Sequence, residues 1–271
     1  MKKALYYAFI FLCIQFFLSQ AVTLVWAAVS GGGADAVLAL LKGKNAPKQP
    51  ISCTITAQVV CSVATFALFA WRKWAVLSRH YLRTRPFTVL LWSAVAALGV
   101  ILPSAGLQEL LPMLPDLTKG IFRDIMDNQY GYFTLCLFAP LVEEVVFRGA
   151  ILRSLLSSKL HPWVAIAISA LIFSVIHLNP AQMPHAFLVG LLLGWMYLRT
   201  GSILPGVAFH WVNNTAVYAS YILMPQAADL TLSQLFGGDS VRIALSIVFS
   251  LFILVPALFQ LNANMGKEKY S

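Results

Sequence analysis

The chain has 271 residues, of which 59% are hydrophobic and 11% are charged, and it carries a formal net charge of +9. A soluble domain has about 25% charged residues, so this composition excludes an ordinary soluble protein. The positive charge does not indicate a nucleic-acid partner, because much of it lies in one short segment, 72–85, between two apolar runs. We therefore predict an all-α, polytopic membrane helix bundle whose surroundings are the lipid bilayer.

Apolar runs of about 17 to 25 residues predict membrane-spanning helices. The sequence contains eight such runs, at residues 4–29, 51–71, 87–107, 132–152, 162–178, 185–198, 203–223 and 242–261. The first run, after two lysines, also resembles a secretory signal peptide. It is longer than the roughly 7 to 15 apolar residues of a signal, so we expect a retained helix.

We expect one integral membrane domain with three parts. Residues 1–131 contain the first three spans, residues 132–223 contain the next four, and residues 224–271 contain a loop and the last span. An even number of spans places both termini on one side, which then holds 13 of the 19 Lys and Arg residues. Because basic loops stay in the cytoplasm, both termini are predicted to be cytoplasmic in a multi-pass protein of the plasma or inner membrane.

The fourth span contains three charged residues, Glu143, Glu144 and Arg148, in an otherwise apolar helix. Each costs roughly 2.5 to 3.5 kcal/mol at the centre of a membrane helix when it has no partner. Glu144 and Arg148 are four residues apart, so they share a helix face and can form an ion pair. Glu143 lies about 140° from Arg148 around the helix, which leaves its carboxylate for another purpose.

Two later spans add polar side chains to apolar helices. His177 ends the fifth span, and His210 and Asn214 lie one turn apart on one face of the seventh. A carboxylate can take a proton from water, an imidazole can orient that water, and imidazole or amide N–H groups can stabilise an oxyanion. Glu143, His177 and His210 could equally hold a zinc ion with one open position. With or without a metal, the pattern predicts a hydrolytic site.

Three motifs in these spans resemble those of the CPBP family, the membrane-embedded CaaX proteases and bacteriocin-processing enzymes. The family motifs EExxxR, FxxxH and HxxxN correspond to Glu143-Glu144 with Arg148, Phe173 with His177, and His210 with Asn214. The resemblance covers roughly residues 132–220. Members of this family cleave prenylated C-termini or are linked to pheromone and bacteriocin processing and immunity, and the sequence does not choose among these substrates.

The resemblance implies an intramembrane endopeptidase that acts on a peptide or membrane-protein substrate. Glu143 would activate the attacking water with His177. His210 and Asn214 would stabilise the transition state. The supporting residues would be Glu144, Arg148 and Phe173.

Two rival functions stay open at this point. A non-catalytic membrane scaffold or immunity protein could keep the fold and bind its partner without cutting it, although every motif position is filled here. A proton-coupled transporter could use Glu143, His177 and His210 as a relay, but the sequence shows no matching inverted halves.

Three further expectations concern histidines and cysteines. Counting about 1.5 Å per residue from the cytoplasmic ends places His177 roughly 10 Å deeper than Glu143 and His210, unless the fifth helix starts late or tilts. His185, at the start of the sixth span, is expected to lie outside the site. The four cysteines are expected to be small core side chains, at Cys13, Cys53, Cys61 and Cys136.

Overall fold

The structure is a computed structural model that describes residues 1–42, 49–76, 81, 84–111, 114–227 and 230–266. Within these residues the chain forms helices joined by turns and has no strand, which confirms the all-α prediction. All eight predicted spans are helical. The predicted boundaries differ from the observed ones by a few residues at most.

The first half of the chain begins with one long apolar helix, Lys2–Ser30. It comprises α1, a π-helical turn η1, α2 and the start of a second π-helical turn, η2. The bounds of the elements in this half are α1 Lys2–Cys13, η1 Ile14–Leu18, α2 Ser19–Ala27, η2 Ala28–Gly32, α3 Gly33–Lys42, α4 Ile51–Trp71, α6 Phe87–Glu109 and α7 Lys119–Met126.

The second half opens with the fourth predicted span, which is a continuous helical stretch of four elements. The bounds are η3 Phe133–Phe138, α8 Ala139–Glu143, η4 Glu144–Leu152, α9 Arg153–Leu156, α10 Pro162–Ile176, α11 Met183–Thr200, α12 Leu204–Leu223, η5 Pro225–Ala227, α13 Leu232–Leu235 and α14 Ser240–Asn264. Helix α7 lies in the connection between α6 and η3, and helix α13 lies in the connection between α12 and α14. Both connections mix apolar and charged residues.

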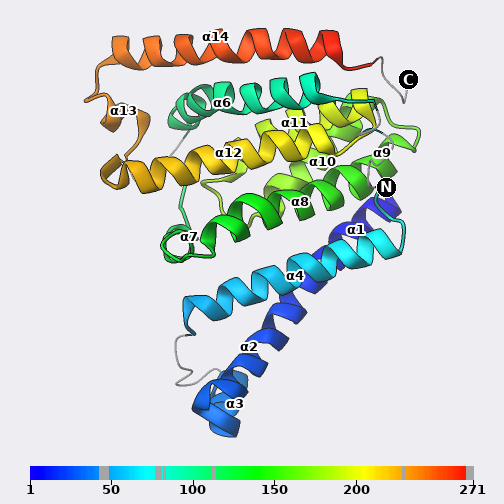
Figure 1. The fold of residues 1–271 in the computed structure, drawn as a ribbon, viewed down its shortest axis with the longest axis vertical. Helices are drawn as coiled ribbons and strands as arrows, with labels where there is room; N and C mark the ends of the chain where they lie inside the picture. Colours follow the sequence, from blue (N-terminus) through cyan, green and yellow to red (C-terminus); the bar gives the residue numbers. More distant parts are fainter. Residues whose placement is uncertain (43–48, 77–80, 82–83, 112–113, 228–229, 267–271) are drawn as a thin grey trace.

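The helices with polar side chains lie in the middle of the bundle. Figure 1 shows α6 and α14 along one side, α1 and α4 along the other, and α8, α10, α11 and α12 between them. The packing agrees, since α6 contacts both α14 and α12, and α1 and α4 contact η4. The middle helices therefore have protein on both of these sides, and polar groups in a membrane protein are stable where they face other helices.

Among the residues that the structure describes, four helices are long and apolar enough to cross a membrane by themselves, namely Lys2–Ser30, α4, α6 and α14. They are the outer helices, and at most 33% of each apolar window is buried inside the protein, so lipid must cover the rest. The start of α1 and the end of α14 lie at the same end of the bundle (Figure 1). This agrees with an even number of crossings, while eight crossings and cytoplasmic termini stay predictions.

Two segments of the fourth helical stretch, η3 and η4, are π-helical and not α-helical. A π-helical turn contains one more residue than an α-helical turn and often occurs at functional sites. All nine residues of η4, Glu144–Leu152, are buried. Hydropathy predicts where a helix lies but not this wider winding, so the π-helical segments could not be predicted from the sequence.

The cysteines are free thiols, and Cys53, Cys61 and Cys136 are buried while Cys13 is half-buried. The prediction of small core side chains is confirmed for Cys53, Cys61 and Cys136, whereas Cys13 is only partly in the core.

The most extensive helix contact, between α6 and α14, depends on a small residue. A Cβ atom at Gly99 would lie 2.6 Å from the backbone nitrogen of Leu254, and Ser250 Oγ donates to the Gly99 carbonyl at 3.2 Å.

We expect Gly99→Ala to destabilise the protein by about 1 to 3 kcal/mol, because the backbone of α14 must move away from α6. Gly120→Ala in the surface helix α7 is the control, since nothing lies within 4 Å of its Cβ position, and alanine favours a helix. Thermal unfolding in detergent measures both. Equal midpoints for Gly99→Ala and wild type would show that α6 and α14 do not pack this closely.

Candidate active site

A buried ion pair joins Glu144 and Arg148. Arg148 Nη1 donates to Glu144 Oε1 at 2.8 Å, and the two side chains are 2% and 0% exposed. This is the pair that the four-residue spacing predicted. The guanidinium also lies over the Phe173 ring, 4.4 Å from its centroid, and Nη2 donates to the Gly190 carbonyl at 3.4 Å. Arg148 thus links η4 to both α10 and α11.

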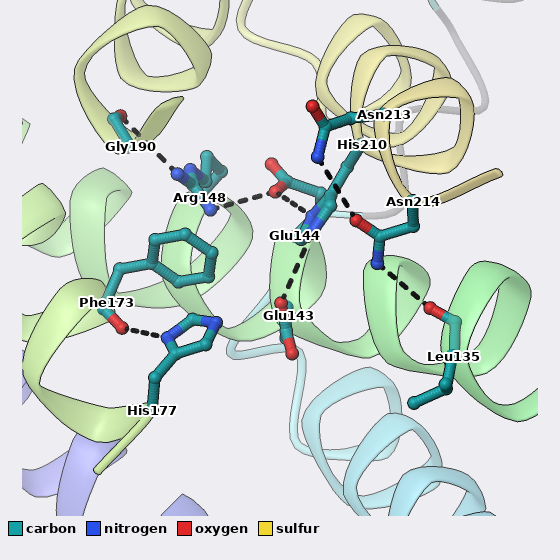
Figure 2. A network of polar contacts seen from close by, with 10 residues as sticks. All are labelled: Leu135, Glu143, Glu144, Arg148, Phe173, His177, Gly190, His210, Asn213 and Asn214. Carbon is teal, nitrogen blue, oxygen red and sulfur yellow. Dashed lines mark hydrogen bonds and ion pairs between the residues drawn. The ribbon is translucent and has the colours of Figure 1, made fainter. Parts of the chain in front are cut away.

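His210 contacts both carboxylates of the motif from α12. Its Nε2 atom lies 3.6 Å from Glu143 Oε2, and its Nδ1 atom lies 3.4 Å from Glu144 Oε1. A carboxylate oxygen only accepts, so the 3.4 Å contact with Glu144 is a hydrogen bond when Nδ1 carries a proton. The 3.6 Å contact with Glu143 is too long for a hydrogen bond. Figure 2 shows His210 between these two glutamates.

The two glutamates differ in exposure. The Glu144 side chain is fully buried and faces Arg148, whereas the Glu143 side chain is 23% exposed and contacts His210 alone among the described ion pairs. The difference follows from the turn between adjacent residues on a helix, as the sequence predicted. Glu143 is therefore the carboxylate that a water molecule can reach.

His177 is oriented by the helix that carries it. Its Nδ1 atom lies 2.7 Å from the Phe173 carbonyl, and its ring packs edge-on against the Phe173 ring at 4.8 Å. Because a carbonyl only accepts, Nδ1 carries the proton, and in the neutral ring Nε2 is left as an acceptor. Figure 2 shows the ring turned toward Glu143.

Phe173 contacts both motif histidines. Its ring centroid lies 4.8 Å from that of His177 and 6.0 Å from that of His210. Helix α10 begins at Pro162, as predicted, so a late start of this helix does not account for the approach. The expected difference between the depths of His177 and His210 in the membrane stays a prediction.

Asn214 lies beside the site with both ends of its amide engaged. Its Nδ2 atom donates to the Leu135 carbonyl at 2.9 Å, and its Oδ1 atom accepts from Asn213 Nδ2 at 3.4 Å. Leu135 lies in the π-helical segment η3, so the wider turn offers this carbonyl to α12. One of the two N–H groups of Asn214 is used in this contact.

Two glycines that the sequence did not single out as site residues make room for the charged groups. A Cβ atom at Gly206 would lie 2.5 Å from Glu144 Oε2, so α12 can approach the buried carboxylate only without a side chain there. A Cβ atom at Gly190 would lie 2.9 Å from the Ala170 Cβ atom, so this glycine lets α11 approach α10 and Arg148. Both glycines lie among apolar residues, so no functional role could be predicted for them from the sequence.

His185 lies closer to the site than expected. It interacts electrostatically with His210 and His177, and its Nδ1 atom lies 2.9 Å from Ser104 Oγ. Ser104 donates its proton to the Ile101 carbonyl at 2.9 Å, so Ser104 Oγ accepts from His185. The sequence missed this proximity because it depends on how α6 packs beside α11.

The proposed zinc ligands do not fit a metal site. A zinc site needs at least three protein ligands about 2 Å from one point. In the ranges that the structure describes, no three His, Cys, Asp or Glu side chains are grouped to hold an ion. Glu143 and His210 contact each other instead. We therefore derive no step through a metal.

The part of the chain that contains this site is similar to known proteins. The family model described as "Type II CAAX prenyl endopeptidase Rce1-like" matches residues 128–216, which include every motif residue. The match confirms the resemblance that the three motifs indicated. A relative from Escherichia coli, an "Uncharacterized 24.3 kDa protein", is 34% identical over 128 residues, which cover 45% of this chain and 58% of the relative. No solved structure matches the chain.

We expect Arg148→Met to destabilise the protein by about 3 to 5 kcal/mol, because it leaves the Glu144 carboxylate buried without its partner. Adding Glu144→Gln should recover much of this loss. The control is Arg242→Met in the exposed pair with Asp239, where both side chains are at least 43% exposed, with an expected change below about 1 kcal/mol. Denaturant unfolding measures all four proteins. Equal stability of the Arg148 single and double variants would contradict the assignment.

Proposed function

We propose that this protein is a membrane-embedded endopeptidase that hydrolyses a peptide bond with a water molecule activated by Glu143. The observation that carries the proposal is the different setting of the two glutamates. Glu144 is neutralised by Arg148 at 2.8 Å, whereas Glu143 is partly exposed and lies 3.6 Å from His210. The match of residues 128–216 to a CAAX prenyl endopeptidase family supports the same reaction class.

In the proposed reaction Glu143 takes a proton from the water. The hydroxide adds to the carbonyl carbon of the scissile bond and forms a tetrahedral intermediate. When the C–N bond breaks, Glu143 returns the proton to the leaving amine, so one water yields a carboxyl group and an amine. His177 supports this step, because its unprotonated Nε2 atom can accept a hydrogen bond from the water and orient it.

Two residues of α12 are assigned to the developing oxyanion. A donor aimed at this oxygen contributes most when it is held in place and shielded from bulk water. His210 is 7% exposed and is held between two carboxylates, and Asn214 is held by the Leu135 carbonyl. We assign the second N–H group of Asn214 and the Nε2 proton of His210 as the donors.

The substrate class follows from the family match and from the position of the site. The site lies among the middle helices, so a substrate must enter from a membrane surface or from the lipid. We propose a membrane-associated peptide of the CAAX type as the first substrate to test, and a pheromone or bacteriocin precursor as the second. An immunity or scaffold protein would bind such peptides without cutting them, and a transporter would move protons without cutting.

We expect Glu143→Gln to lower the rate of peptide cleavage at least about a hundredfold, because the amide cannot accept the water proton. The assay uses the full chain in detergent or liposomes with a prenylated CAAX peptide and an unprenylated peptide library. Asp35→Asn is the matched control, since Asp35 is exposed in α3 and far along the chain from the site. Unchanged thermal unfolding would show that Glu143→Gln folds. Equal cleavage by wild type and Glu143→Gln would overturn the mechanism.

We expect chelators such as EDTA and 1,10-phenanthroline to leave the cleavage rate unchanged. The reason is that Glu143, His177 and His210 are not grouped as metal ligands in the described part of the chain. Metal analysis of the purified protein accompanies the assay. Activity that chelators abolish and added zinc restores would contradict this expectation. Together with zinc that is bound by the wild type and absent from His210→Ala, it would support the zinc hypothesis.

A further inference from the structure

A cavity lies at the end of the bundle where α1 begins. Its volume is about 540 Å³, and three segments that are far apart in the sequence line it: the start of α1, the turn after α4, and α9. Its charged lining residues are Lys2, Lys3, Lys73 and Arg153. Arg153 lies ten residues after Glu143 along one helical stretch, about 15 Å away, so this cavity is separate from the candidate active site.

Among the described residues, no acidic side chain balances the positive charge around this cavity. Its lining contains no Asp or Glu, and none of its four cationic side chains forms an ion pair with a carboxylate of the described residues. Like charges around one cavity repel each other, more strongly at the low-dielectric edge of a membrane than in water. An anion bound between them would remove this repulsion.

The walls of the cavity are held in place. Lys73 has a positive φ of 55°, which is uncommon for a residue with a side chain, and the turn is closed by the Lys73 N–H bond to the Ala70 carbonyl at 3.1 Å. Trp74 and Tyr7 line the cavity, and their ring centroids lie 5.2 Å apart. Aromatic side chains beside cations are typical of the boundary between lipid and water.

We propose that this cavity binds the phosphate group of an anionic phospholipid. The cations would contact the phosphate, while the aromatic wall would contact the glycerol and the upper acyl chains. This end of the bundle is the one predicted to be cytoplasmic, where basic pockets between membrane helices bind anionic headgroups. Soluble phosphates share the charge but not the apolar contacts, so the lipid is favoured. The bound headgroup would join α1 to α9, at the end of the stretch that carries the motif glutamates.

The test measures lipid binding to the purified full chain, independently of peptide cleavage. Native mass spectrometry in detergent counts bound phosphatidylglycerol and, separately, phosphatidylcholine, and soluble glycerol phosphate is added as a competitor. The variants are Lys3→Gln, Lys73→Gln and Arg153→Gln, singly and combined. Lys159→Gln is the matched control, because Lys159 follows Arg153 closely in the sequence and is exposed but does not line the cavity.

We expect wild type to prefer phosphatidylglycerol and each removed cation to weaken its binding about fivefold. Lys159→Gln should bind as wild type does, and unchanged unfolding midpoints without lipid should show that the variants fold. Equal binding of the two lipids, or an equal loss in Lys159→Gln, would overturn the proposal. Glycerol phosphate binding as tightly as phosphatidylglycerol would overturn the lipid as the source of the phosphate.

Discussion

The buried pair of Glu144 and Arg148 is the interaction on which the polar centre of this bundle depends. Two charges with almost no exposure are stable only if each satisfies the other and the remaining N–H groups find acceptors. Arg148 donates hydrogen bonds to Glu144 and to the Gly190 carbonyl, and its guanidinium lies over the Phe173 ring. The pair therefore fixes η4, α10 and α11 relative to one another. Glu144 extends the network to α12 through His210, so the ion pair joins four elements.

The sequence was sufficient to predict the helices and much of the polar centre. Long apolar runs gave the boundaries of α4 and α12 almost to the residue, because in a membrane every backbone group must be bonded within a helix. The spacing of Glu144 and Arg148 gave the ion pair for the same geometric reason, since residues four apart share a face. Local regularity in the chain predicts such features well.

Contacts between helices were beyond the sequence. Gly206 lies among apolar residues in an ordinary helix, and only the approach of Glu144 Oε2 shows why no side chain fits there. The bond from Asn214 to the Leu135 carbonyl needs the wider π-helical turn of η3, which hydropathy does not reveal. The contact of Phe173 with both motif histidines depends on how α10 lies relative to α12. Each of these features arises from a pair of helices and not from either one alone.

The two motif histidines are chemically distinct because their partners differ. His177 faces a backbone carbonyl, which holds its proton on Nδ1 and leaves Nε2 as an acceptor in the neutral ring. His210 faces a carboxylate on each side, with Nε2 3.6 Å from Glu143 and Nδ1 3.4 Å from Glu144. In the proposed reaction, His177 accepts a hydrogen bond from water and His210 donates one to the developing negative charge. The difference in their partners supports these two roles, so the surrounding helices, and not the histidines themselves, distinguish the two residues.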